Sequence, residues 1–441
     1  MSNEALGMLM LALLVVSVLI GFPTAFTLMA LGMIFGFIAF DFLVFDLIVL
    51  KSFQVMTNDV LIAIPVFLFM GYVVERAGLL DNLFKGVLLA TGPLRGSLAI
   101  ATLITGTIFA IATGIVGASV ALLGVLALPP MLRQRYNVSF ASGVITASGT
   151  LGILIPPSIL LILYGYVAGV GVPRLYAAAF FPGLMLAGLY FAYVLGRAYI
   201  QKDLAPALPK EERDYPITTI LWLLLTGMVP IAALITAVLV SILVGFATPT
   251  EAASFGAFGG LVMAAAYRRL SLAMLKESVF LTIRTSAMVG WLLVGSGMFS
   301  ATFALLGGAN LLGRVVSGLG LDAVQFVLLT QVIVFFLGWP LEWTEIVIIF
   351  LPLFLPLIDQ FAVDKVFYGV LMAMNMQTAF LSPPVAMSAY YLLGVAPKGS
   401  VQLGQIFTGM MPFMGLQLVG MAILWTIPEL SNWLPRVMFG Q

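Results

Sequence analysis

Apolar stretches of roughly 20 residues recur along this chain, separated by short polar or Gly/Pro-rich segments; a stretch of this length crosses a bilayer as a helix. An amphipathic piece follows the third of these stretches, at 79–89. The predicted uninterrupted spans are 5–21, 23–41, 59–77, 175–196, 217–245, 249–267, 285–306 and 404–427. The pattern predicts an all-α multi-pass membrane protein with about ten spans and two re-entrant hairpins.

Four further apolar stretches are interrupted by glycine, proline or hydroxyl residues. The two predicted hairpins cover 96–132 and 322–358, with tips at 113–119 and 338–340. The two broken spans cover 138–168 and 366–394, with breaks at 155–158 and 382–384. Because unpaired backbone groups are not tolerated in hydrocarbon, we expect these breaks to meet ions, water or a solute.

The order of span, amphipathic piece, hairpin, broken span and span occurs twice. Matching landmarks lie at a nearly constant separation: Asn82 with Asn310 (228), Pro130 with Pro356 (226), Pro157 with Pro384 (227) and Pro182 with Pro412 (230). In the predicted topology the two copies enter the membrane from opposite sides. An inverted repeat with paired broken helices is typical of secondary transporters.

The distribution of basic residues predicts the orientation. Of the 19 Lys and Arg residues, 14 fall on one side of the predicted topology, and the other side keeps Lys51, Arg174, Arg314, Lys365 and Arg436. The positive-inside rule makes the first side cytoplasmic and places both termini in the periplasm. The most polar loop, 197–216, divides the two halves.

Composition narrows the chemistry. Hydrophobic residues make up 62% of the chain and charged residues 8%, whereas soluble proteins carry about 25% charged residues. A net charge of +1 offers no basic surface for nucleic acid. The chain has no Cys and no His, which excludes iron–sulfur, haem and histidine–zinc sites. We therefore expect no cofactor, and an intramembrane enzyme is the least supported class.

The helix breaks carry the candidate solute-binding residues. Hydroxyls and freed backbone groups at these positions suit an anion and its coupling ions. The alternative is close packing of small residues at the tip and simple kinks at the prolines. The candidates are Thr113, Ser119, Thr150, Pro157, Ser158, Asn375, Thr378 and Ser382.

Two acids, Glu342 and Glu345, lie at the second tip. Acids at membrane depth are functional by default, and these two could ligate Na⁺ or carry a proton. Equally, they could lie in a water-filled mouth or cap the half-helix. Glu251 is interpreted as structural, because Thr248 and Glu251 have the spacing of a capping box.

Three segments resemble the large, DctM-like membrane subunit of tripartite ATP-independent periplasmic (TRAP) transporters. They are 149–158 (GTLGILIPPS), 247–253 (ATPTEAA) and 380–385 (FLSPPV), and the resemblance covers essentially the whole chain. It implies Na⁺-driven uptake of carboxylate solutes across the bacterial inner membrane. The implied partners are a small four-helix membrane subunit and a periplasmic substrate-binding protein.

The resemblance also implies an elevator, in which a transport domain moves against a scaffold. The scaffold would comprise 1–94 and 201–320, and the transport domain 95–200 and 321–441. Na⁺ sites would map to the tips and the second break. The residues concerned are Gly114, Gly117, Ser119, Gly338, Pro340, Glu342, Thr344, Ser382 and Pro383.

The second tip departs from the family pattern. Many members have a Phe-Leu-Asp-Pro-like tip, whereas this chain has WPLEWTE at 339–345. This is more similar to the subgroup associated with lactate, other 2-hydroxy or 2-oxo acids, and mannitol or chloroaromatic compounds. A C4-dicarboxylate or sialic acid is then less expected. Two alternatives stay open: a self-sufficient Na⁺/carboxylate symporter, and a channel-like ion-translocating subunit.

Overall fold

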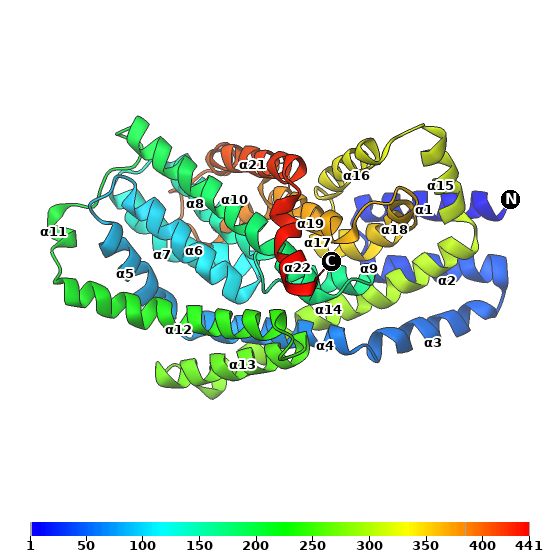
Figure 1. Cartoon of the computed structure of the whole chain (residues 1–441), viewed down its shortest axis with the longest axis horizontal. Helices are drawn as coiled ribbons and strands as arrows, with labels where there is room; N and C mark the ends of the chain where they lie inside the picture. Colours follow the sequence, from blue (N-terminus) through cyan, green and yellow to red (C-terminus); the bar gives the residue numbers. More distant parts are fainter. Residues whose placement is uncertain (1, 384, 441) are drawn as a thin grey trace.

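The computed structural model describes residues 2–383 and 385–440, and its regular elements are all helices (Figure 1). Seven helices are long and apolar enough to cross a membrane. The number rises to eight if α3 (Leu43–Met56) and α4 (Asp59–Arg76), bent by 56° at their junction, form one span. Shorter apolar helices lie between them. The predicted all-α multi-pass membrane fold is confirmed.

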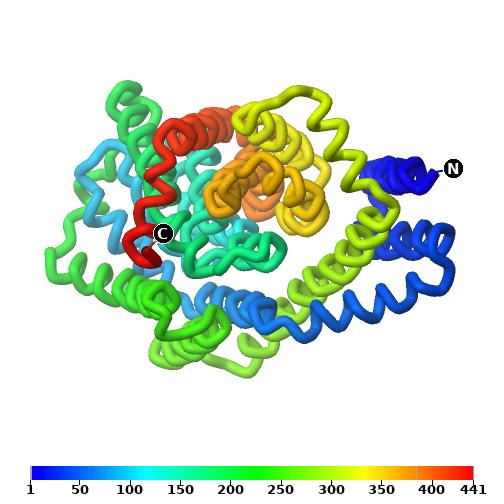
Figure 2. Tube along the Cα trace, turned by 45° about the vertical axis from the view of Figure 1, so that its right-hand side comes forward, coloured from blue at the N-terminus to red at the C-terminus, as the bar shows by residue number. Residues whose placement is uncertain are grey.

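An outer group of helices packs along one flank of the molecule. Helix α4 packs against α13 (Pro249–Ala266) and α14 (Leu272–Leu305). The other members are α1 (Asn3–Ile20), α2 (Thr24–Phe40) and α12 (Ile217–Leu243). In Figure 2 these blue, green and yellow-green helices curve around the cyan and orange ones.

The inner group consists of helices that turn back or break. Its first copy is α6 (Ser97–Thr113), α7 (Val116–Arg133), α8 (Val138–Thr150), a 3₁₀ turn (Leu151–Ile153), α9 (Ile159–Ala168) and α10 (Val172–Ile200). Its second copy begins with α16 (Ala323–Leu337) and α17 (Trp343–Glu345), then a π-helical turn (Ile346–Phe350) and α18 (Leu351–Gln360). The second copy ends with α19 (Lys365–Leu381), α20 (Met387–Val395) and α21 (Leu403–Thr426).

The order of helices therefore repeats. Each copy is preceded by an amphipathic helix, α5 (Leu79–Thr91) or α15 (Gly308–Gly318). The two copies touch at equivalent positions: the Thr150 hydroxyl lies 3.4 Å from the amide oxygen of Gln377, 227 residues further on. Pro384, the partner of Pro157 in the sequence comparison, lies outside the described residues.

The side-chain signals at helix ends act as the sequence predicts. Thr248 caps α13: its N–H donates to Glu251 at 2.8 Å, and its hydroxyl accepts from the Glu251 N–H at 3.3 Å. Ser158 is the N-cap of α9. Gly114 ends α6 with φ of 63°, a left-handed conformation that suits glycine. The capping-box interpretation of Glu251 is confirmed.

Three helical segments are absent from the predicted elements. Helix α3 contains Asp46, Lys51 and Gln54, and α22 (Glu429–Phe439) contains Glu429 and Arg436. These charges interrupt the apolar pattern, so neither segment resembles a membrane span. Helix α14 begins at Leu272, before the predicted start at 285, and is about 51 Å long. It is longer than the hydrocarbon core is thick. The short α11 (Lys210–Arg213) lies in the polar loop.

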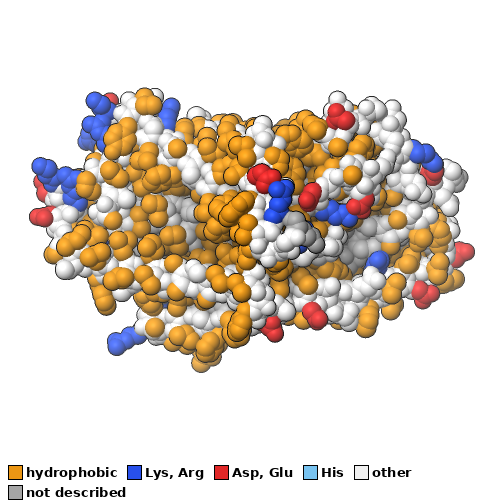
Figure 3. Space-filling view, in the orientation of Figure 1, with side chains coloured by type: hydrophobic (Ala, Val, Ile, Leu, Met, Phe, Trp, Pro, Cys, Tyr) orange, Lys and Arg blue, Asp and Glu red, His pale blue; other side chains and the backbone are white. Residues whose placement is uncertain are grey.

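The surface follows the same division. In Figure 3 apolar side chains cover most of the visible face, as expected for a surface in contact with lipid. Lys and Arg side chains gather at the end of the molecule where α11 lies.

Two glycines hold the repeats together. A Cβ atom on Gly409 of α21 would lie 1.8 Å from the Ser139 carbonyl oxygen, and one on Gly143 of α8 would lie 2.0 Å from the Gly409 carbonyl oxygen. Both obstacles are backbone atoms, which cannot move aside without displacing a helix.

Gly409→Ala should therefore destabilise the protein by about 2 kcal/mol or more, since overpacking a tight contact costs that much. We expect a lower melting temperature and a lower yield of monodisperse protein in detergent. Gly415→Ala is the matched control, because this glycine lies in the same helix with nothing within 4 Å of the added atom. Equal melting temperatures for the two variants would contradict the packing argument.

Candidate functional site

A cavity of about 200 Å³ lies where the two tips meet the outer helices. The first tip contributes Gly114–Gly117, and the second contributes Glu342–Thr344. The outer helices contribute Ile64, Leu68 and Tyr72 of α4 and Thr285, Met288 and Val289 of α14. Ile159, Phe380 and Tyr391 complete the lining. The cavity thus joins parts of the chain that are up to 327 residues apart.

Three helices begin at this cavity. Val116 opens α7, Ile159 opens α9, and Trp343 opens the continuous helical run Trp343–Gln360. The first turn of a helix has N–H groups without intrahelical partners and carries a partial positive charge. Three such ends around one small space favour a bound anion.

Hydroxyl groups and one carboxylate provide the polar side chains of the lining. The Tyr72 and Thr285 hydroxyls lie 3.1 Å apart. The Thr344 hydroxyl is buried without a hydrogen-bond partner. Glu342 is exposed toward the cavity, and its N–H donates to the Glu345 carboxylate at 3.0 Å. Among the described lining residues, none is Lys or Arg.

The two tip acids therefore differ in role. Glu345 caps the helix start in the manner of a capping box, which was one of the alternatives open from the sequence. Glu342 is the residue at the cap position, and its carboxylate is directed to the space between the tips and the outer helices.

The structure brings together the predicted residues of the first tip. The Thr113 and Ser119 hydroxyls lie 3.2 Å apart, and Ser119 donates to the Ile115 carbonyl at 2.9 Å. Both side chains are buried inside the tip, so they brace the turn. Gly114 and Gly117 line the cavity, and the Tyr391 ring lies only 3.0 Å from where a Cβ atom on Gly117 would be.

The residues of the two broken spans divide differently. Ser158 caps α9 at the cavity, whereas buried Thr150 is directed to Gln377. Asn375 donates to the Gln331 backbone oxygen at 2.7 Å, and Thr378 donates to the Asn375 carbonyl at 2.6 Å. These two side chains and Thr150 are not among those lining the cavity. Their part in solute binding stays a prediction, as does that of Pro157.

A second, smaller cavity of about 120 Å³ adjoins the first at the second tip. Gly338, Pro340 and Glu342 line it. Near it, at the end of α19, the Ser382 hydroxyl is buried and has no hydrogen-bond partner. Pro383 follows, and Pro384 is outside the described residues. This second space is where the sequence places the Na⁺ ligands of the second repeat.

Sequence reasoning missed the lining residues contributed by other elements: Tyr72, Thr285, Trp343, Phe380 and Tyr391. Polar aromatic side chains within apolar spans are the one local signal that Tyr72 and Tyr391 give. Nothing local indicates that Thr285, more than 160 residues after the first tip, lies opposite it.

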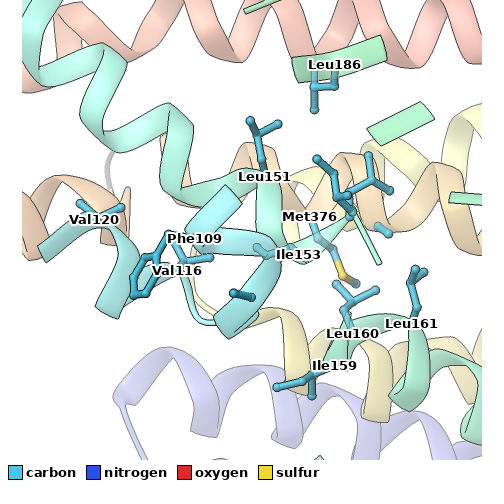
Figure 4. Packing of buried hydrophobic residues seen from close by; sticks show 14 of the residues in the cluster. Phe109, Val116, Val120, Leu151, Ile153, Ile159, Leu160, Leu161, Leu186 and Met376 are labelled. Atoms are coloured by element: carbon cyan, nitrogen blue, oxygen red, sulfur yellow. The ribbon is translucent and has the colours of Figure 1, made fainter. Parts of the chain in front are cut away.

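Apolar packing fixes the tips from behind. Figure 4 shows Phe109, Val116 and Val120 of the first hairpin close to Ile153 and Ile159 of the broken span. Leu160 and Leu161 of α9 and Met376 of α19 continue this buried cluster. Close packing of this kind holds the helix starts in a fixed geometry.

The fold and the cavity define a multi-pass membrane transporter rather than an enzyme. Residues 10–430 match the family model described as "Tripartite ATP-independent periplasmic transporter, DctM component". The chain therefore belongs to this family, as its motifs predict.

Individual relatives cover most of the chain. The C4-dicarboxylate TRAP transporter large permease protein DctM of Pseudomonas aeruginosa is 28% identical over 88% of both chains. The sialic acid TRAP transporter large permease protein SiaM of Vibrio cholerae is 25% identical over 87% of this chain and 88% of its own. The isethionate TRAP transporter permease protein DctMQ of Oleidesulfovibrio alaskensis is 28% identical over 93% of this chain but 63% of its own length.

A solved structure supports the fold alone. The YdaH transporter of Alcanivorax borkumensis aligns with a TM-score of 0.61 and 17% identity, covering 90% of this chain and 88% of that one.

The hydroxyl pair of the first tip should contribute measurably to stability. We expect Thr113→Val and Ser119→Ala to show a coupling energy of about 1 kcal/mol in a double-mutant cycle, the usual value of one buried hydrogen bond. Chemical unfolding in detergent measures it. Thr107→Val paired with Ser119→Ala is the control, because Thr107 bonds only to Leu103 in its own helix. Additive effects of Thr113→Val and Ser119→Ala would show that the pair does not brace the tip.

Proposed function

We propose that this chain is the large permease subunit of a Na⁺-coupled transporter that takes up a small organic acid across the bacterial inner membrane. The observation that carries this proposal is the meeting of three helix N-termini at one cavity without Lys or Arg among its described lining residues. Such a site holds a carboxylate by backbone N–H groups and hydroxyls.

The proposed partners are a periplasmic binding protein that delivers the solute and a small four-helix membrane subunit. The family name describes a tripartite transporter of which this chain matches one component. The length of the DctMQ relative, beyond the part that this chain matches, is consistent with a second membrane component. Both termini would face the periplasm, opposite the end where basic side chains gather.

The proposed Na⁺ ligands are neutral oxygens at the tips and breaks. Hard cations prefer oxygen ligands, and helix ends leave carbonyl groups available. In the first repeat these come from Gly114, Gly117 and Ser119. In the second they come from the segment around Gly338, Pro340 and Thr344, and from Ser382 and Pro383, beside the smaller cavity.

The proposed mechanism is an elevator in which the inner group of helices moves against the outer group. The division would follow 1–94 and 201–320 against 95–200 and 321–441. The contact that supports it is close but small: a Cβ atom on Gly71 of α4 would lie 2.7 Å from the Thr113 carbonyl oxygen at the first tip. A smooth glycine surface on α4 suits a tip that passes along it.

Lactate should bind the purified chain at least about tenfold more tightly than lactamide, because helix N-termini favour the charged group by about 1–2 kcal/mol. Quenching of tryptophan fluorescence measures binding, and Trp343→Phe, which removes the reporter in the cavity, should abolish the quenching but keep the thermal shift. Binding should be tighter in NaCl than in choline chloride, and a Na⁺ gradient should drive uptake into liposomes. Equal binding of lactate and lactamide would exclude a carboxylate site.

Gly71→Ala should disfavour the state in which the tip touches α4, because the added methyl group meets a backbone oxygen. The chain has no Cys, so a single Ile115→Cys reporter in the cavity measures this directly. We expect membrane-impermeant maleimide to label it from both sides, and Gly71→Ala to change the ratio of the two rates severalfold. Gly290→Ala in α14, with open space around it, is the control. Labelling from one side only would contradict an elevator.

A further inference from the structure

We propose that Glu342 sets the charge selectivity of the cavity, so that the transported solute is a small acid with one negative charge and a hydroxyl group. This inference rests on the proposed function, because it assumes that a carboxylate binds at the three helix N-termini.

Glu342 is the one charged side chain among the described residues that line the cavity. It forms no ion pair with the described Lys and Arg residues, whose ion pairs involve other acids. The acid next to it in the tip, Glu345, is engaged by the Glu342 N–H. The negative charge of Glu342 therefore faces the solute space without a basic side chain to offset it.

The size of the cavity brings this charge close to any bound solute. An apolar cavity of about 150 Å³ holds benzene, so the cavity of about 200 Å³ takes a solute only slightly larger. A carboxylate held at the helix N-termini occupies the favourable part of this space. A second carboxylate on so small a molecule would lie near Glu342, where two like charges disfavour each other.

The same side chain favours a hydroxyl group on the solute. An ionised carboxylate only accepts hydrogen bonds, and a bond from a hydroxyl to it is charge-assisted and strong. The Thr344 hydroxyl, buried and without a partner, offers a second polar contact on the same tip. Glu342 and Thr344 together select a hydroxylated monocarboxylate over a dicarboxylate of similar size.

Three probes separate charge from hydroxyl: lactate, propionate and succinate, each titrated in NaCl at pH 7.5 with tryptophan fluorescence and thermal shift as readouts. For the wild type we expect lactate to bind about tenfold more tightly than propionate and at least tenfold more tightly than succinate. Glu342→Gln should reduce the preference for lactate over succinate at least tenfold. Glu342→Asp, which keeps the charge, should retain the wild-type order.

Asp322→Asn is the matched control. Asp322 caps α16 at the far end of the same hairpin, and asparagine caps a helix equally well. The variant removes one negative charge from the hairpin without touching the cavity, so the ratio of lactate to succinate affinity should stay within threefold of the wild type.

The outcomes separate the two proposals. Failure of all three acids to bind the wild type would overturn the proposed function itself. Binding with an unchanged ratio in Glu342→Gln would overturn only the selectivity inference. A variant that loses the NaCl dependence of lactate binding, with the ratio unchanged, would assign Glu342 to the cation and also overturn it. If Glu342→Gln fails to fold, tight succinate binding by the wild type is sufficient to reject the inference.

Discussion

The constraint on which this structure depends is that backbone N–H and C=O groups in a bilayer need partners. A helix that stops half-way across hydrocarbon exposes several of them, at a cost of several kcal/mol for each unsatisfied group. This chain begins three helices at one cavity and partly satisfies two of the starts with its own side chains, Ser158 and Glu345. The groups that stay free surround a space into which an anion fits, so the cost of breaking the helices becomes binding energy for a solute.

Broken helices also need rigid support, and the chain provides it by close backbone contacts. A Cβ atom on Gly152 would lie 2.1 Å from the Ala110 carbonyl oxygen, so the 3₁₀ turn after α8 rests directly on the first hairpin. Gly143 and Gly409 join α8 to α21 in the same way. Side chains at these positions would push apart the elements that hold the helix starts together.

Most of the fold could be predicted from the sequence, because span length and Gly/Pro breaks report directly on the bilayer. Helices α3 and α22 could not, since their charged residues hide them among loops. The site was predictable where the chain itself turns, at 113–119 and at the second tip. It was not predictable for Asn375 and Thr378: the sequence shows a polar face on α19 but not its direction, and that face is turned to Gln331 of α16. Tyr72 and Thr285 were missed because tertiary packing alone places them opposite the tips.

Charge links the solute to the coupling ion in the proposed mechanism. A carboxylate and Glu342 together would place two negative charges in a region that crosses a low-dielectric barrier when the inner helices move, and moving uncompensated charge there is expensive. The helix N-termini offset part of this charge, but their partial charges are fixed and cannot follow the presence or absence of a solute. Cations bound by carbonyl and hydroxyl oxygens at the neighbouring breaks can. The loaded site then approaches neutrality only when solute and cation are both present. That condition couples the two without a basic side chain in the cavity, and an acid beside an anion site is therefore compatible with cation-coupled transport.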